Sequence, residues 1–152
     1  MLFSEKEKPL YSDSAMEKIP AQYKYLFIAS NQTIKAYGSK VKTFPLDKPV
    51  TEGIISVDLN GHTPGHSGFL IESKGQKLLI AGDFLHIGAI QFPHPEYSLI
   101  FDADIKQAVE MRKQTLNKLV AEKLPFAATH IPFPGIGTVS SANEGFVFTP
   151  VK

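Results

Sequence analysis

A long amphipathic helix is the feature that most constrains how this sequence folds, because its apolar stripe must be buried against another layer. Asp102 or Asp104 is expected to cap its start, and Pro125 follows its expected end. The stripe has helical spacing and consists of Ile105, Ala108, Val109, Leu116, Leu119 and Val120. The chain therefore needs a sheet or other helices on which this helix packs.

Short β-like segments lie on both sides of that helix. We expect strands at residues 41–44, 54–59, 68–72 and 78–82 before it, and at 126–129 and 146–151 after it. Lys74-Gly75 is typical of a hairpin turn. An earlier helix is predicted to open after Pro20, and Gly38 is its expected stop. We therefore predict a single domain over residues 1–152 of the α/β (α+β) class.

Composition narrows the classes of protein. The 152 residues are 43% hydrophobic and 20% charged, which is usual for one globular domain. Sixteen basic residues face fifteen acidic ones without a basic cluster, so we expect no nucleic-acid partner. No apolar run approaches the ~18 residues of a membrane helix, and the charged start is unlike a signal peptide. We predict a cytoplasmic chain with no membrane contact. The absence of cysteine restricts metal ligands to His, Asp and Glu.

Three loops at the ends of predicted strands carry side chains suited to metal binding. Imidazole nitrogens and carboxylate oxygens are the ligands that zinc, iron and manganese accept when thiolate is absent. The loops are residues 60–68 with His62 and His66, 80–84 with Asp83, and 128–137 with His130. Taken singly, each histidine is more often a hydrogen-bonding loop residue, and an aspartate after a strand glycine is often a turn residue. Their combination in this order favours one shared site.

The combination resembles the metallo-β-lactamase superfamily. The string Gly61-His62-Thr63-Pro64-Gly65-His66 is similar to its third metal motif, Gly82-Asp83 to its fourth, and Thr129-His130 to its fifth. Residues 78–83, 89–92 and 130–137 are similar to the methyl parathion hydrolase branch, which includes phosphotriesterases and related lactonases. The resemblance covers nearly the whole chain.

This resemblance implies a role for each matching residue. His62 is expected to bind one metal and His130 a second metal, while Asp83 bridges both. Each metal would then keep two protein ligands in this chain. His66 is expected to support the ligands without touching the metal, and His86 and Phe101 to line the substrate pocket. The cofactor implied is a pair of zinc ions, with iron, manganese or cobalt as alternatives.

The family's His-x-His-x-Asp-His motif is missing from this sequence, in which His62 is the first histidine. The resemblance therefore implies the C-terminal half of an αββα sandwich: a mixed sheet with helices on one face at residues 45–152, preceded by a helical insert at residues 1–44. The other face of that sheet would be apolar and uncovered, and such patches mark interfaces. We expect a homodimer or a separate N-terminal half as partner.

Two main functions follow. The first is a fragment of a metal-dependent hydrolase of ester, lactone or phosphotriester bonds, acting on a small molecule through a metal-bound hydroxide and weakly active or inactive alone. The second is a non-catalytic remnant or pairing module that keeps the fold without the whole site. A plain α/β domain with structural histidines is a third, less specific interpretation.

Overall fold

The computed structural model describes residues 1–152 except 13, 15–16 and 18. The chain divides into two compact units, Met1–Pro45 and Leu46–Lys152, which are described separately below. Among the described residues, no helix combines the length and the apolar character needed to cross a bilayer. The single-domain organisation stays a prediction.

The first unit holds the predicted early helix. Helix α2 (Lys24–Tyr37) follows a 3-10 turn, η2 (Ala21–Tyr23), and ends at Gly38, whose φ of 49° suits glycine. Strand β1 (Leu2–Ser4) pairs in parallel with β2 (Lys42–Phe44). The predicted helix and the strand at 41–44 are thus confirmed, whereas β1 was missed because three residues give no readable alternation. The remaining 3-10 elements are η1 (Glu5–Tyr11) and η3 (Gly38–Lys40).

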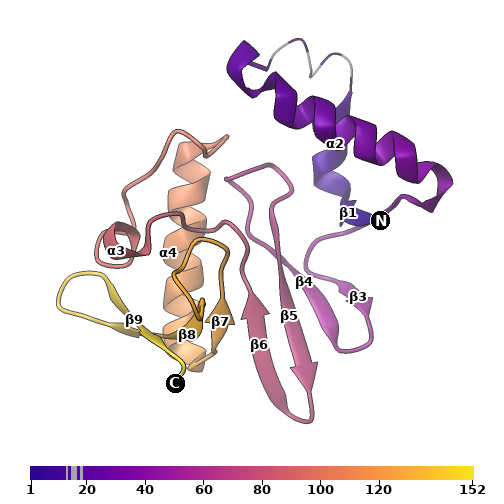
Figure 1. Ribbon diagram of the computed structural model, residues 1–152. Helices are drawn as coiled ribbons and strands as arrows, with labels where there is room; N and C mark the ends of the chain where they lie inside the picture. The colour runs from indigo at the N-terminus through magenta and orange to yellow at the C-terminus, as the bar shows by residue number, and fades with distance from the viewer. Residues whose placement is uncertain (13, 15–16, 18) are drawn as a thin grey trace. The chain divides into compact units, whose positions relative to one another are not determined.

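A seven-stranded mixed sheet forms the second unit, in the order β3-β4-β5-β6-β7-β8-β9 (Figure 1). Only β6 and β7 pair in parallel, because the long helix connects them; the other neighbours are antiparallel. The strands are β3 (Pro49–Thr51), β4 (Ile54–Asp58), β5 (Ser67–Ser73), β6 (Gln76–Ile80), β7 (Phe126–Ala127), β8 (Ile136–Ser141) and β9 (Phe146–Pro150). The mixed α/β class is therefore confirmed.

Two strands of this sheet were not predicted. Strand β3 lies at the edge and begins with a proline, which a strand tolerates only at such a position. Strand β8 lies partly in the predicted loop 128–137 and buries few apolar side chains, Val139 among them. Both exist because neighbouring strands pair with them, which a local pattern does not reveal.

The predicted long helix is α4 (Ile105–Glu122), which packs on one face of the sheet (Figure 1). Asp104, of the two candidates, caps it by accepting a hydrogen bond from the Gln107 N–H at 2.9 Å. Lys123, with a φ of 50°, ends the helix two residues before Pro125. The core between helix and sheet includes Leu59, Leu79, Ala81, Leu116, Leu119, Leu124, Phe126 and Val139. A short helix, α3 (Gly88–Gln91), lies between β6 and α4.

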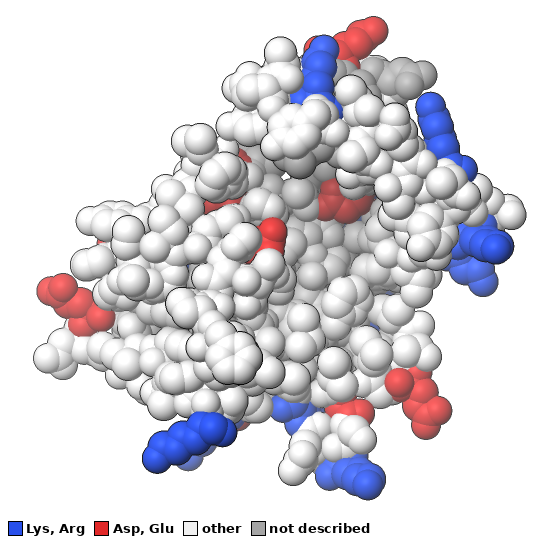
Figure 2. All heavy atoms as spheres, viewed as in Figure 1, with Lys and Arg blue, Asp and Glu red and all other residues white. Residues whose placement is uncertain are grey.

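The opposite face of the sheet is also apolar. Strand partners share a face, so Leu79 and Phe126 point toward α4 while their neighbours Ile80 and Ala127 point away. Ile80, Ala127 and Ile136 are not part of the core under α4, and each is only partly buried. Figure 2, drawn in the same view as Figure 1, shows few charged side chains over the middle of the visible face and more at its margins.

Candidate metal centre

The three predicted loops meet at one edge of the sheet. Strands β4, β6 and β7 run in the same direction, because β4 and β6 are each antiparallel to β5, and β6 is parallel to β7. His62 follows β4, Asp83 follows β6 and His130 follows β7. Side chains that leave the C-terminal ends of co-directed strands are brought to a common edge. The order of strands thus creates the convergence.

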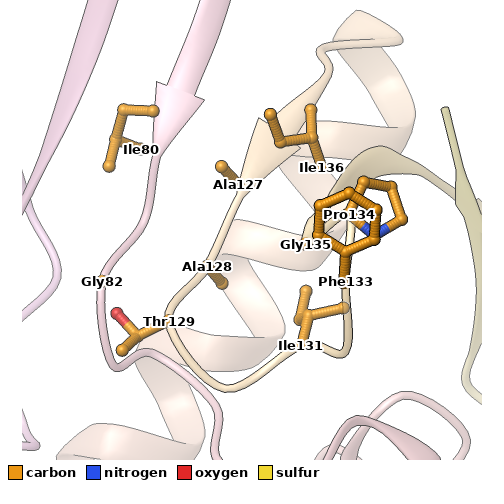
Figure 3. A pocket seen from close by; sticks show the side chains of 10 residues that line it. All are labelled: Ile80, Gly82, Ala127, Ala128, Thr129, Ile131, Phe133, Pro134, Gly135 and Ile136. Atoms are coloured by element: carbon orange, nitrogen blue, oxygen red, sulfur yellow. The ribbon is translucent and has the colours of Figure 1, made fainter.

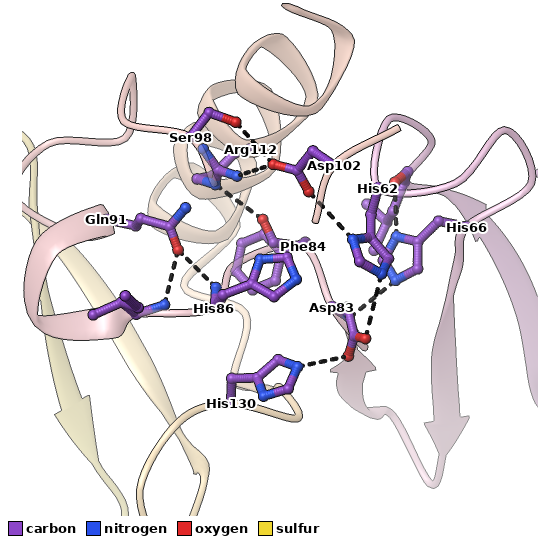
Figure 4. A network of polar contacts seen from close by, with 12 residues as sticks. His62, His66, Asp83, Phe84, His86, Gln91, Ser98, Asp102, Arg112 and His130 are labelled. Atoms are coloured by element: carbon purple, nitrogen blue, oxygen red, sulfur yellow. Dashed lines mark hydrogen bonds and ion pairs between the residues drawn. The ribbon is translucent and has the colours of Figure 1, made fainter. Parts of the chain in front are cut away.

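Asp83 lies between two of the predicted histidines (Figure 4). His62 Nε2 is 3.6 Å from Asp83 Oδ2, and His130 Nε2 is 3.5 Å from Asp83 Oδ1. One carboxylate therefore offers a separate oxygen to each imidazole. This agrees with the predicted convergence, while the roles of these residues as metal ligands remain a proposal.

A buried ion pair holds the other side of His62. His62 Nδ1 lies 3.2 Å from Asp102 Oδ1, and Asp102 Oδ2 accepts hydrogen bonds from Ser98 Oγ at 3.0 Å and Arg112 Nη2 at 3.3 Å. Arg112 donates further hydrogen bonds to three backbone carbonyls, and its side chain is 0% exposed. Asp102 is 1% exposed at its side chain. If Nδ1 carries the proton and donates it to this buried carboxylate, Nε2, which faces Asp83, is left free to bind a metal.

Sequence reasoning missed this support. Asp102 was considered only as a helix cap, which Asp104 in fact provides. Arg112 had one visible signal: it lies four residues from both Ala108 and Leu116, on the buried stripe of α4. A charged residue in an apolar stripe needs a buried partner.

The loop that carries His62 contacts the backbone of α4 at Gly61. Gly61 has a φ of 127°, and a Cβ at this position would lie 2.4 Å from the Cα of Ala108. The carbonyls of Gly61 and His62 accept hydrogen bonds from the N–H groups of Asp104 and Ala103. The residues at the start of α4 therefore fix the position of the loop that carries His62.

His66 forms a hydrogen bond with the backbone of Asp83. Its Nε2 accepts a hydrogen bond from the Asp83 N–H at 2.9 Å, so its Nδ1 carries the proton and donates to the Leu59 carbonyl at 2.8 Å. Gly82 is required here, because its φ is 54° and a Cβ would lie 2.8 Å from His66 Nε2. Both ring nitrogens of His66 are engaged with the backbone in this arrangement.

His86, predicted to line the substrate pocket, lies beside His62 and Asp83. A nitrogen of His86, a nitrogen of His62 and an oxygen of Asp83 lie within 4.8 Å of one another. The His86 ring is 4.9 Å from the His62 ring, stacks on His130 at 5.1 Å, and lies 5.9 Å from Phe101. Phe101 is 58% exposed and sits at the rim.

Gln91 was also missed, and it holds His86 in place. Its Oε1 accepts hydrogen bonds from the N–H groups of His86 at 2.6 Å and Ile87 at 2.9 Å, and its Nε2 donates to the Tyr97 carbonyl. Gln91 is 1% exposed. A buried amide with both ends satisfied is a rigid support.

The charges of the site favour an ionised carboxylate and a neutral imidazole. Burial alone raises the pKa of Asp83, but a hydrogen bond from Thr129 and the positive potential of His130, His62 and His66 outweigh it and hold this pKa below its ordinary value. Burial lowers the pKa of His86, and the neighbouring His62 and His130 lower it further, despite Asp102 and Asp83. A lowered pKa favours the deprotonated form of each group, which is the form that binds metals.

The donor set fits a divalent metal ion. His62, Asp83, His86 and His130 offer imidazole nitrogens and carboxylate oxygens, the set that zinc and iron accept without thiolate. Within the described part of the chain, the buried Nδ1 of His86 has no hydrogen-bond partner. Such an atom is costly unless it has a partner.

A shallow hollow lies beside this edge, between β6 and the loop after β7 (Figure 3). Its volume is about 400 Å³. Gly82 and Thr129, the neighbours of Asp83 and His130, form one end, and Phe133, which is 98% exposed, forms the other. Ile80 and Ile136, on the sheet face opposite α4, also line it. The edge that carries Asp83 and His130 is thus continuous with the apolar face.

Comparisons with known proteins agree with this architecture. No family profile and no curated protein sequence matches the chain. The hydrolase AbOPH of the beta lactamase superfamily is similar in structure, with 29% identity and a TM-score of 0.86 over 99% of this chain and 54% of its own. AidC, a dizinc quorum-quenching lactonase solved with the product N-hexanoyl-L-homoserine, has 26% identity and a TM-score of 0.89 over 99% of this chain and 54% of its own.

More distant structures share the fold. A probable metal-dependent hydrolase from Staphylococcus aureus has 18% identity and a TM-score of 0.66 over 99% of this chain and 52% of its own. The chain therefore has the metallo-β-lactamase fold, and it spans about half the length of the hydrolases that it matches.

Proposed function

We propose that this chain supplies one half of the metal centre of a metal-dependent hydrolase that cleaves ester, lactone or phosphotriester bonds. The observation that carries the proposal is the position of Asp83 between His62 and His130, with one carboxylate oxygen toward each. Two relatives in structure that exceed 25% identity are a hydrolase and a lactonase of this fold. We infer the lactonase and phosphotriesterase branch from the same loops.

Each residue has a task in this proposal. His62 would hold one metal, His130 a second, and Asp83 both. Bound metals supply a water of lowered pKa as nucleophile and polarise the attacked C=O or P=O bond. The chain's own contribution is to keep the Asp83 carboxylate ionised and to fix the ring of His62 through Asp102.

The substrate is proposed to be a small molecule that reaches the edge beside His86 and Phe101. A lactone is the best supported class, because AidC is a lactonase and was solved with a homoserine product. The apolar hollow beside the site is suited to an acyl or aryl substituent of such a molecule.

The uncovered sheet face supports a protein partner. Ile80, Ala127 and Ile136 would be covered by a second copy or by a separate chain that carries His-x-His-x-Asp-His. That motif, absent from this sequence, is also what a complete pair of metal sites would need. The same absence favours the alternative function, a pairing module without catalysis.

Reconstitution tests the proposal. The purified chain, supplied with zinc, is mixed with a polypeptide that carries His-x-His-x-Asp-His on the matching half of the fold, and hydrolysis of an N-acyl homoserine lactone, an aryl ester and a phosphotriester is measured. We expect turnover by the mixture, weak or no turnover by either chain alone, and loss of turnover with Asp83→Ala. His94→Ala is the control, since His94 pairs with Glu96 outside the site. A complex that forms without hydrolysing any of the three would support the pairing module instead.

A further inference from the structure

We propose that His62, Asp83 and His86 together bind one divalent metal ion within this chain, with His86 as a direct ligand. This rests on the proposed function only in sharing His62 and Asp83, and it differs by giving the first metal a third ligand. The three ligand atoms already lie within 4.8 Å of one another. Ligand atoms around one tetrahedral zinc ion, with bonds of about 2.0–2.2 Å, lie about 3.4 Å apart, so small movements of these side chains would bring all three atoms to one ion.

His130 is placed differently. It approaches Asp83 Oδ1, whereas His62 approaches Oδ2. Its side chain is 42% exposed, compared with 20% for His62. Asp83 thus turns one oxygen toward the less exposed His62 and the other toward the more exposed His130.

Each member of the set is held from behind by a buried or backbone-bonded group. Asp102, fixed by Arg112, holds His62; His66 holds the backbone of Asp83; and Gln91 holds the backbone of His86 (Figure 4). In the described part of the chain, His130 has no such hydrogen-bonded support behind its ring; its contacts are Asp83 and the stack on His86. The fold therefore pre-organises three ligands.

This ligand set has a known chemistry. Two imidazoles and one carboxylate form three-ligand catalytic zinc sites with a fourth position open for water, and also non-haem iron sites. The buried Nδ1 of His86, which lacks a partner among the described residues, marks this ring as unsatisfied without a ligand. The chain then does not need a second half to bind its first metal.

Cobalt(II) titration of the metal-free chain, followed by visible absorption, tests the inference. We expect one cobalt per chain. His86→Phe preserves the stacked ring but removes the nitrogen that would bind the metal. We expect it to weaken cobalt binding by more than about 100-fold, which exceeds the loss of about 10–100-fold that is typical when a group supporting a ligand is removed. His130→Phe should change the affinity of this first site only a few-fold. His94→Phe is the matched control, and circular dichroism of each metal-free variant checks that it folds.

Proton NMR of the cobalt-loaded chain separates a ligand from a neighbour. Coordinated imidazoles give strongly shifted, exchangeable ring N–H signals, so we expect two, one of which disappears in His86→Phe and neither in His130→Phe. Unchanged affinity and signals in His86→Phe, with loss in His130→Phe, would overturn the inference and leave the hydrolase proposal standing. No cobalt binding by the unmodified chain would overturn the inference, whereas the hydrolase proposal depends separately on turnover in the reconstituted mixture.

Discussion

At the scale of single residues, the site is defined by groups that hold the ligand candidates as much as by the candidates themselves. Asp102, Arg112 and Gln91 are all buried and polar, and each is satisfied by hydrogen bonds: those of Gln91 are to residues close in the sequence, whereas Asp102 and Arg112 also bond more distant segments. The sequence allowed prediction that His62, Asp83 and His130 lie close together, because each follows a strand in a glycine-containing loop. The hydrogen-bond partners of the buried supports were not predicted: Arg112 shows its burial by its place on the apolar stripe of α4, but the pattern does not identify Asp102 as its partner.

Replacing Asp102 by asparagine tests the support of His62. Asparagine keeps the size but removes the charge that orients Nδ1, so we expect zinc affinity to fall by about 10–100-fold. Asp104→Asn, two residues away, is the matched control, because asparagine caps a helix as well as aspartate does. Isothermal titration with zinc measures both. Equal affinities in the two variants would contradict the role of Asp102.

Replacing Arg112 by leucine tests the buried ion pair. The change leaves the Asp102 carboxylate in the interior without its cation, and loss of one partner of a buried pair costs about 3–5 kcal/mol. Lys113→Leu is the control, since Lys113 is exposed on the same helix and should cost less than about 0.5 kcal/mol. Urea unfolding of the metal-free chain gives both free energies. A loss below about 1 kcal/mol in Arg112→Leu would mean that the pair is not structurally important.

At the scale of elements, the spacing of apolar residues predicted the helices and strands that bury one regular face. The predicted long helix and the predicted strands at 54–59, 68–72 and 78–82 all correspond to observed elements. The predicted stripe was wrong at Ile105, which is 55% exposed because it lies in the first turn of α4. Strands β3 and β8 escaped prediction because their pairing is determined by β4 on one side and by β7 and β9 on the other. The close approach of the 60–68 loop to α4 was likewise invisible, although its glycines indicated a tight turn.

Replacing Gly61 by alanine tests that approach. Alanine must adopt a φ of 127° and place its Cβ 2.4 Å from Ala108 Cα, so the loop or the helix must shift. Gly75→Ala is the control, with a φ of 75° but open space around the Cβ. We expect about 1 kcal/mol of destabilisation for Gly75→Ala, and at least about 2 kcal/mol more for Gly61→Ala. Similar losses in urea unfolding would show that backbone strain alone matters at Gly61.

At the scale of the whole molecule, the apolar sheet face opposite α4 and the edge that carries Asp83 and His130 belong to one surface. A charged side chain introduced into an apolar interface loses its water without gaining a partner, which costs several kcal/mol of binding free energy. Ile136→Lys should therefore weaken association, with itself or with the complementary half, by at least about 10-fold. Ile105→Lys, on the exposed side of α4, should leave association unchanged. Sedimentation equilibrium measures both, and equal association constants would exclude this face as the interface.

The central claim is that His62 and Asp83 bind a metal ion, and a crystal of the zinc-loaded chain tests it most directly. Anomalous difference density collected at the zinc edge locates the ion without assumptions about activity or partner. We predict a peak about 2.0–2.2 Å from a ring nitrogen of His62 and a carboxylate oxygen of Asp83. An ordered His62 and Asp83 with no peak between them, or zinc found only at surface residues such as His94 and Glu96, would contradict the account.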